Sequence, residues 1–469
     1  MIHHNGRLSS LLLIAALISA FFTACSEKDE LLLDHVPDDI FGVAIVNIDS
    51  LSLKAGCQVA PDGSLILTPD LKKLCGKADK SFSKAVDIVC AVAPYINTVD
   101  LAIVCEEPKS KPFLMFEIFD YDKLTAAIEK MGGKQSQDDD FDVFDLTDCQ
   151  LVASGRLGWI VGNVQQVKDL EQRAAKGAIA DLSPLKDYLD QNHDFCAAFN
   201  PKLEDPKEDY SPMFLADIKN GGLFAELSFM DGKGDTFNFQ KNIGDMDRSV
   251  LEYIPQGTQI LLGIGEMKDS ESLLEALRPV AKEFFSEKVM SAFGVATGLS
   301  SMINGSTIIA LAPDATSKDL ADISPDTWEM LFLSKMSEQN MQKTVDMAKI
   351  FLDENGYDVT DLDSTEYTFK YDGRPVNFGI DNGYIYAANY DLDEHERSPV
   401  APENETKLAM FRVLIPKNSE TAKAFGLPWG VSFHSTISRH YIMFVLRLPG
   451  ANGPVLKEVI ARACQHIKD

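Results

Sequence analysis

The chain has 469 residues, of which 45% are hydrophobic and 25% charged, so it is long enough for roughly two or three domains with apolar cores. Its formal net charge is −27, and a field of that sign repels nucleic acid and anionic lipid head groups while favouring cationic partners. The composition therefore excludes a disordered chain and argues against a nucleic-acid-binding protein.

Residues 1–24 have the pattern of a cleaved signal peptide. Arg7 is the only charged residue in them, and Leu11 to Phe22 is an unbroken run of apolar and small residues. The run is too short for a transmembrane helix, which needs roughly 20 apolar residues. It ends at Cys25, and the stretch FFTACSEKDE resembles a bacterial lipoprotein signal, in which the cysteine thiol is acylated and the chain is cut before it. An ordinary signal followed by a chance cysteine is the alternative.

Residues 25–34 are predicted to be an acidic tether. The sequence SEKDE after Cys25 resembles the export tag of surface lipoproteins of Bacteroidota, although a solvated acidic tether is the simpler interpretation. Removing residues 1–24 takes away one positive charge, that of Arg7, and leaves −28. Each buried methylene of an acyl chain contributes about 0.8 kcal/mol, so a multiply acylated Cys25 would hold the protein on a membrane. The resemblance implies an outer-membrane lipoprotein exposed at the cell surface, or alternatively facing the periplasm.

The rest of the chain contains two similar halves. HVPDDIFGVAIVNID, from His35, and YIPQGTQILLGIGEM, from Tyr253, each place a proline before a strand-like run. A helical stretch is predicted after each of them. YINTVDLAIVC (residues 95–105) then aligns with MINGSTIIALA (residues 302–312) without a gap.

A short strand and an amphipathic helix come next in each half: PFLMFEIF before DKLTAAIEKMGG, and WEMLFL before SEQNMQKTVDMAKIFLDENG. The apolar faces of the two helices are Leu124, Ala127, Ile128 and Met131, and Met341, Val345, Ala348 and Leu352. Gly132 and Gly356 are the predicted C-terminal stops.

The final matches are strands. GWIVGN pairs with GYIYAAN, each predicted to be the second strand of a hairpin entered from FDVFDL or YTFKYDG; FCAAFNP pairs with LAMFRVL, and NGGLFAELSF with PWGVSFHSTI. We therefore expect an α+β fold of two tandem homologous units, residues 35–250 and 251–469. Each would be a mostly antiparallel sheet with helices packed on one face. Chance likeness between two α+β segments is the alternative.

The proline-led strand VPDDIFGVAIVNIDSL followed by a helix resembles a family of Bacteroidota lipoproteins that carries only a domain-of-unknown-function label. The resemblance covers nearly the whole mature chain. It implies the duplicated α+β architecture, and it brings no catalytic residues with it.

Signatures of common chemistry are missing from the sequence. It contains no GxxxxGK[ST], GxSxG, HExxH or CxxC, so we predict no cofactor and no metal. Gly263 and Gly265 lack the third glycine of a dinucleotide-binding turn and are predicted to lie in a strand where backbones approach closely.

Seven cysteines follow Cys25, an odd number that cannot all pair. Cys57 with Cys75 is the one pair to test for a disulfide. Cys90, Cys105 and Cys196 lie in apolar runs and are predicted to be buried free thiols.

His434 and His440 have the even spacing that places two strand residues on one face. Hydrogen-bonded surface histidines are expected, with a weak metal site as the alternative. The acidic clusters are Asp138 to Asp140, Asp358 with Asp361 and Asp363, and Asp231 with Asp235. None fits the calcium-loop pattern, and solvated loops or turns are expected, with weak calcium binding by one cluster as the alternative. Gly232 and Gly234 predict a hairpin turn between Asp231 and Asp235.

Aromatic residues alternate in the second half. Tyr367, Phe369 and Tyr371 lie on one predicted strand, and Tyr384 and Tyr386 on the strand expected to pair with it. Tyr371, Tyr384 and Tyr386 are the candidate binding residues, because an exposed aromatic platform could stack against sugars. Packing of these rings in the core is the default interpretation, and Trp159 favours it because it occupies the place of Tyr384 in the first half.

The sequence thus predicts a membrane-anchored surface lipoprotein that is not an enzyme and binds a protein, glycan or envelope component. The alternative is an extracellular hydrolase that acts on a polymer through carboxylates in the cleft between the two halves; such carboxylates need nearness in space and not in sequence.

Overall fold

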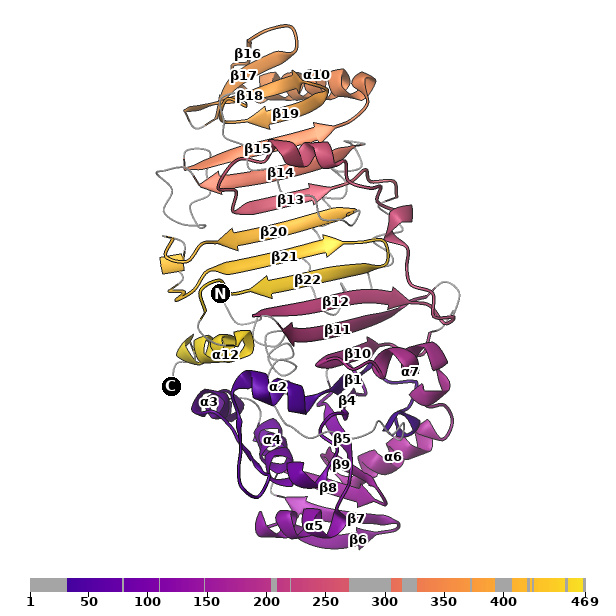
Figure 1. The fold of residues 1–469 in the computed structure, drawn as a ribbon. Helices are drawn as coiled ribbons and strands as arrows, with labels where there is room; N and C mark the ends of the chain where they lie inside the picture. The colour runs from indigo at the N-terminus through magenta and orange to yellow at the C-terminus, as the bar shows by residue number, and fades with distance from the viewer. Residues whose placement is uncertain are drawn as a thin grey trace. The chain divides into compact units, whose positions relative to one another are not determined.

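The computed structural model describes residues 32–77, 80–108, 110–146, 148–203, 209–219, 221–269, 305–313, 327–371, 373–392, 407–419, 422–423, 426–451 and 454–466. They form an α+β fold rich in antiparallel strands (Figure 1). The chain divides into two compact units, residues 1–236 with 452–469, and residues 237–451. The predicted boundary after residue 250 differs from this division, and the C-terminal segment belongs to the first unit.

The first unit is a ten-stranded antiparallel sheet whose strand order is β6-β7-β8-β9-β5-β4-β1-β10-β11-β12. Its strands are β1 (Gly42–Val46), β4 (Leu101–Cys105), β5 (Phe113–Glu117), β6 (Lys134–Asp138), β7 (Phe141–Leu146), β8 (Cys149–Ser154), β9 (Leu157–Val161), β10 (Phe195–Phe199), β11 (Ser211–Lys219) and β12 (Gly222–Met230), with a separate ribbon of β2 (Gln58–Val59) and β3 (Leu65–Ile66). Its helices are η1 (Leu32–His35), α2 (Ile48–Ala55), α3 (Pro69–Lys77), α4 (Lys80–Val92), η2 (Ala93–Tyr95), α5 (Tyr121–Lys130), α6 (Val164–Ala174), η3 (Ile179–Asp181), α7 (Ser183–Leu189) and α12 (Val455–His466).

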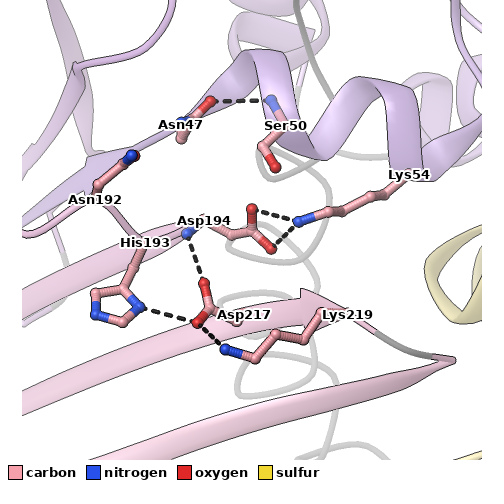
Figure 2. A pocket seen from close by; sticks show the side chains of 8 residues that line it. All are labelled: Asn47, Ser50, Lys54, Asn192, His193, Asp194, Asp217 and Lys219. Atoms are coloured by element: carbon pink, nitrogen blue, oxygen red, sulfur yellow. Dashed lines mark hydrogen bonds and ion pairs between the residues drawn. The ribbon is translucent and has the colours of Figure 1, made fainter.

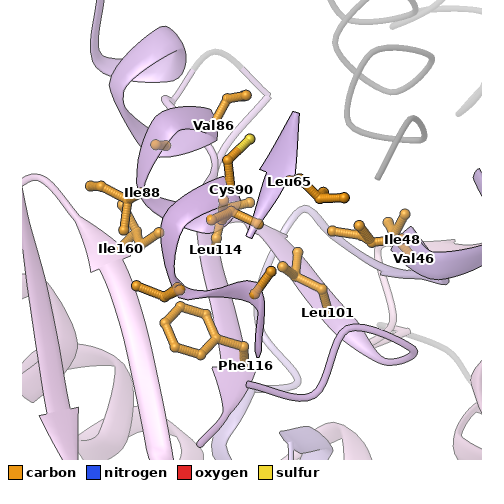
Figure 3. Packing of buried hydrophobic residues seen from close by; sticks show 14 of the residues in the cluster. Val46, Ile48, Leu65, Val86, Ile88, Cys90, Leu101, Leu114, Phe116 and Ile160 are labelled. Atoms are coloured by element: carbon orange, nitrogen blue, oxygen red, sulfur yellow. The ribbon is translucent and has the colours of Figure 1, made fainter. Parts of the chain in front are cut away.

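Helices cover both faces of this sheet. On one face, Val46, Leu114 and Phe116 pack beneath α2, α4 and α5 (Figure 3). On the other, Val43 and Trp159 pack against α6 and α7. The prediction of helices on one face was therefore wrong for this unit. The physical reason is visible in the strands, since β1, β4 and β5 are apolar at nearly every position and so must be buried on both sides.

The predicted two-stranded hairpins are three-stranded meanders. β8 lies between β7 and β9 in the first unit, and β18 (Arg374–Asp381) lies between β17 (Glu366–Tyr371) and β19 (Tyr384–Ala388) in the second. The amphipathic helix α5 has its predicted face inward, with Leu124 and Ile128 fully buried.

Helix α12 closes the first unit although it lies at the end of the sequence. It packs against α2 and α3, and Leu456, Ile460 and Cys464 join the same core as the helices α2 to α4. Cys464 Sγ donates to the carbonyl of Asp70, in α3, over 2.8 Å.

The second unit has the strand order β16-β17-β18-β19-β15-β14-β13-β20-β21-β22, also antiparallel throughout. Its other strands are β13 (Ile260–Ile264), β14 (Ser306–Pro313), β15 (Trp328–Lys335), β16 (Thr360–Asp361), β20 (Ala409–Ile415), β21 (Val431–Ile437) and β22 (Tyr441–Arg447), and its helices include η4 (Phe239–Lys241), η5 (Arg248–Tyr253) and α10 (Glu338–Glu354). Taken in chain order, its ten strands pair with one another in the same way as the ten strands of the first sheet.

The core of the second unit has two clusters. Met246, Val250 and Ile254, around η5, pack on one face of the sheet with Leu261 and Tyr386. Helix α10 packs on β18 and β19 with its predicted face, Met341, Val345, Ala348 and Leu352, directed inward. Gly132 and Gly356 take φ of +88° and +83° after α5 and α10, as expected for helix stops.

Equivalence by place in the sheet departs from equivalence by sequence at the end of each unit. The sequence matches β12 with β21, whereas the pairing order makes β12 the counterpart of β22 and leaves β11 as the counterpart of β21. By the register of β5 with β9 and of β15 with β19, Trp159 takes the place of Tyr386 and not of Tyr384.

Candidate functional site

A polar pocket of about 380 Å³ lies in the first unit between α2 and the strands β10 and β11 (Figure 2). Asn47, Ser50 and Lys54 contribute one side of it at i, i+3 and i+7, the spacing that places residues on one helix face. Asn192, His193 and Asp194 come from the turn before β10, and Asp217 and Lys219 from alternate positions on β11.

Local sequence fixes α2 over this pocket. Asn47 caps the helix, because its side-chain oxygen accepts from the amide of Ser50 at 2.9 Å. Gly56 ends the helix with φ of +78°, a backbone conformation that favours glycine. The amide of Asn47 also donates to the carbonyl of Asp194 at 3.0 Å, so the start of α2 is held on the turn before β10.

The Asp194 carboxylate is the centre of the pocket. Its side chain is 5% exposed, and Lys54 Nζ donates to both of its oxygens at 2.5 and 2.6 Å. The backbone amide of Ile218, on β11, donates to Oδ2 at 2.6 Å. The Asp194 carboxylate therefore connects three elements: helix α2, strand β11, and the turn that precedes β10.

Asp217 carries a second set of bonds. His193 Nδ1 and Lys219 Nζ each lie 3.0 Å from its Oδ2, and the amide of Asp194 donates to Oδ1 at 3.2 Å. Burial raises the pKa of Asp217, but the hydrogen bonds from Lys219 and His193 outweigh burial and hold it below its ordinary value. Asp217 is therefore a carboxylate at neutral pH and has no proton to donate.

The pocket is arranged to present fixed polar groups. Lys54 and Lys219 are held by carboxylates, and both carboxylates accept from more than one donor. Such an arrangement holds donors and acceptors in place for a polar ligand, whereas a general acid needs a raised pKa. Nearby on β12, burial raises the pKa of Glu226, with His193 opposing it.

Asp49, in the first turn of α2, is a further perturbed carboxyl. Burial raises its pKa to about 6, against a hydrogen bond of 2.8 Å from Thr98 Oγ1. Only 8% of Asp49 is exposed and it does not line the pocket, so its place is in the packing of α2 on the loop before β4.

Tyr384 and Tyr386 pack in the core, as the default interpretation expects, and do not form an aromatic platform with Tyr371. β17 pairs with β18 and not with β19, so Tyr384 and Tyr386 point to the face of the sheet opposite Tyr367. Tyr384 and Tyr386 are buried in the core, where Tyr386 donates to Glu366 at 2.8 Å. Tyr371 is exposed and stacks on Tyr357 with ring centroids 6.3 Å apart. The three tyrosines therefore do not form a joint binding surface, because Tyr384 and Tyr386 are packed in the core.

Neither the alternative metal site at His434 and His440 nor calcium binding by an acidic cluster has support among the described residues. Across the described ranges, no group of three or more His, Cys, Asp or Glu side chains is placed to hold a metal ion. His434 lies on β21 but His440 lies in the turn after it, so the even spacing does not place both on one strand face.

The acidic clusters are loops and turns. Lys168 donates to Asp138 and Asp139, in the β6–β7 turn. The amide of Asp231 donates to the carbonyl of Asp235 at 3.0 Å, which confirms the predicted turn, and Gly234 alone of its two glycines takes a positive φ, +89°. Asp361 pairs with Lys349, and Asp363 accepts from the amides of Thr365 and Glu366.

The cysteines of the described part of the chain are free thiols. Cys57 and Cys75, the pair singled out for a disulfide, are not joined by one. Burial raises the pKa of Cys75 to about 11, and the nearby Asp87 carboxylate and Cys57 thiol act in the same direction. Cys90 and Cys196 are buried as predicted, and Cys105 is half-buried.

Two glycines and the N-terminal segment complete the predicted features. Gly263 lies in β13, and a Cβ on Gly265 would collide with the carbonyl of Gly244, which confirms the close backbone approach. Cys25 and the predicted signal peptide lie outside the described residues. Within the described residues, no helix combines the length and the apolar character needed to cross a membrane.

The residues of the pocket were missed by sequence reasoning. The available signals were the i, i+3, i+7 spacing of Asn47, Ser50 and Lys54 and the alternation of Asp217 with Lys219. Neither shows that the helix and the strand meet, which only the register of the sheet supplies.

No protein-family model matches the chain, and no curated protein matches its sequence. A solved structure described as crystal form III of TP0453 is similar at a TM-score of 0.28 and 8% identity, over 45% of this chain and 83% of that chain. A likeness at that TM-score carries no argument about fold or function.

Proposed function

We propose that this chain is a lipoprotein of the bacterial envelope, anchored in the outer membrane through Cys25 and working as a non-catalytic binding or accessory protein. The anchor is inferred from the apolar run Leu11 to Phe22, which stops at Cys25 and is followed by charged residues. The proposal includes exposure at the cell surface and membership of the Bacteroidota lipoprotein family that the sequence resembles.

The proposal also includes an internal duplication. The two units share the pairing order of ten strands, and each has a helix, α5 or α10, between its third and fourth strands. A common ancestor for the two halves accounts for that shared order together with the sequence matches. The two halves should be aligned by the positions of their strands in the sheet, which makes β12 the counterpart of β22.

One observation supports the binding role: the carboxylates of Asp194 and Asp217 both accept hydrogen bonds from other groups of the protein. Lys54 and the Ile218 amide hold the first, and His193 and Lys219 hold the second. Groups fixed in this way suit recognition of a small polar ligand or a polar segment of a partner, such as a glycan.

The anchor is tested by fractionation and mass spectrometry. Cells that make the wild-type chain should hold it in the outer membrane with an acylated N-terminal cysteine, and Cys25→Ser should release it into the soluble fraction. Protease added to intact cells should digest the wild-type protein. A wild-type protein that is soluble, or that has an unmodified mature N-terminus, would contradict the anchor.

The binding role is tested by a thermal-shift screen of the mature chain with glycans, followed by hydrolysis assays on each glycan that stabilises it. We expect a shift that Lys54→Met and Asp217→Asn reduce, with no release of product. Turnover that is abolished by a single carboxylate substitution would overturn the binding role.

The hydrolase alternative keeps one supporting observation. Asp217 and Glu226 lie on neighbouring strands with their pKa values moved in opposite directions, down for Asp217 and up for Glu226, as in an acid and base pair. Glu226→Gln is therefore the decisive variant in the hydrolysis assay: turnover lost in Glu226→Gln would favour the enzyme.

A further inference from the structure

The outward face of α10 carries an apolar ridge. Met347, Ile350 and Phe351 are 61%, 57% and 64% exposed, and their i, i+3, i+4 spacing places them side by side. The opposite face of the same helix supplies Met341 and Val345 to the core. Helix α10 is therefore apolar on two faces, one of which is used for folding and the other of which faces solvent.

The fold does not require this ridge. Helix α5 occupies the same place in the first unit, between its third and fourth strands, and is anchored by Leu124 and Ile128 in the same manner. The fully exposed positions of α5 are Asp122, Lys123, Ala126, Glu129 and Lys130. A helix at this position thus folds with a polar outer face, and the three large apolar side chains of α10 need another reason.

The border of the ridge is acidic. Asp346 and Asp353 are exposed along one side of it, about two helical turns apart, with Lys349 between them in the sequence. Lys349 does not offset them toward solvent, because its Nζ binds Asp361 at 2.6 Å and lies 4.4 Å from the centre of the Tyr367 ring. At the ends of the ridge, Lys343 and Glu354 balance each other.

We propose that this ridge, Met347, Ile350 and Phe351 with Asp346 and Asp353, is a docking surface for a partner protein that presents apolar side chains bordered by lysine or arginine. Charge decides between this occupant and two others. A second copy of the chain would bring like carboxylates together, and an anionic lipid surface would be repelled by them. Exposed apolar patches bordered by polar residues commonly mark protein interfaces.

The proposal deepens the binding role and rests on it, but not on the lipid anchor. Its experiment uses the mature chain with Cys25→Ser in solution and two labelled synthetic helical peptides. Both peptides carry leucines at i, i+3, i+4 and i+7; one has lysines beside the leucines and the other has glutamates. Binding is measured by fluorescence anisotropy.

We expect the lysine peptide to bind at least tenfold more tightly than the glutamate peptide. The ridge variant Met347→Ser, Ile350→Ser, Phe351→Ser keeps every charge of the protein and should lose at least tenfold in affinity. The border variant Asp346→Lys, Asp353→Lys should reverse the preference. The matched control Asp122→Lys, Glu129→Lys on α5 should leave both affinities unchanged.

The proposal is overturned if the ridge variant, folded by circular dichroism, binds the lysine peptide as the parent does, or if neither peptide binds. Flotation of the parent with vesicles of phosphatidylcholine and phosphatidylglycerol, lost in the ridge variant, would assign the ridge to lipid instead. If the parent sediments as a dimer and the ridge variant as a monomer, the ridge is assigned to self-association instead. Failure of this surface leaves the membrane release of Cys25→Ser and the glycan assays untouched, so the two proposals fail separately.

Discussion

Nδ1 of His35 lies 2.8 Å from Oε2 of Glu171, so the first described element of the chain, η1, is tied to α6. The hydrogen bond to Glu171 raises the pKa of His35 above its ordinary value, against the effect of burial. The stabilisation from this pair is therefore complete below about pH 6 and is lost as the pH rises through the folded-state pKa.

We expect His35→Asn to lower the stability of the first unit by about 1 kcal/mol at pH 5.5, roughly 2–4 °C in Tm, and by much less at pH 8.5. Differential scanning calorimetry at the two pH values measures this. Equal losses at both would mean that packing, and not the charge of His35, is what the substitution removes.

The pair of Lys54 with Asp194 should be the strongest single polar contribution to the pocket. Asp194→Ala leaves the Lys54 ammonium and the Ile218 amide without their acceptor, and we expect a cost of about 3 kcal/mol in the free energy of unfolding. Urea denaturation measures it. Lys219→Ala is the matched control, since that side chain is 57% exposed and its ion pair should contribute less than about 1 kcal/mol.

A comparable loss in Asp194→Ala and Lys219→Ala would show that the buried pair of Lys54 with Asp194 contributes no more than the exposed pair of Lys219 with Asp217. The position of Asp194 beneath α2 would then have no special role in holding the helix on the sheet.

Asp247 governs the acid stability of the second unit. Burial opposes ionisation, but the hydrogen bonds from Lys335 and Ser249 lower the pKa of Asp247 to about 2. Since the folded-state pKa is depressed, its stabilisation is present above the unfolded value of about 3.9 and disappears as the pH falls toward 2.

Asp247→Asn should therefore reduce the steepness with which the second unit loses stability between about pH 4 and pH 2, and should lower its Tm at pH 7. Melting followed by circular dichroism across that range is the measurement. A variant whose acid melting profile runs parallel to that of the parent would contradict the assignment. Lys335→Met should reproduce the effect of Asp247→Asn.

The boundaries of the second unit predict which fragment folds. Residues 237–451 contain the buried Phe239, Met246 and Val250 and should melt cooperatively alone. Residues 251–469 lack those three side chains and carry α12 without α2 and α3, so we expect a lower Tm and a broader transition. A fragment 251–469 as stable as 237–451 would argue against the structural division.

Local patterns were sufficient for the helices α5 and α10 and for the strands that match between the two halves. The inward faces of α5 and α10 were predicted because an apolar stripe at 3.6-residue spacing has one stable orientation on a sheet. β8 and β18 were not predicted, and CQLVAS and RPVNFGID lie between the two strands of each expected hairpin. Without β18, β17 and β19 are expected to be neighbours, which places Tyr384 and Tyr386 beside Tyr371. In the structure β18 lies between them and changes the neighbours of both strands.

The pocket could not be predicted for a related reason. Lys54 and Asp194 are 140 residues apart, and so are brought together only by the pairing of β10 with β1 and β11. The same limit applies to the two-sided burial of the first sheet, although its continuous apolar strands contained that information.

Because α12 lies at the end of the sequence but belongs to the first unit, the first unit can finish folding only after the whole chain has been made. During synthesis, residues 32–236 emerge long before the helix that covers α2 and α3, so the second unit can finish folding while the first still exposes that surface. A chaperone could bind that surface during this interval. A truncation or nonsense mutation that removes only α12 would likewise destabilise the first unit, at the N-terminal end of the sequence, and leave the second unit intact.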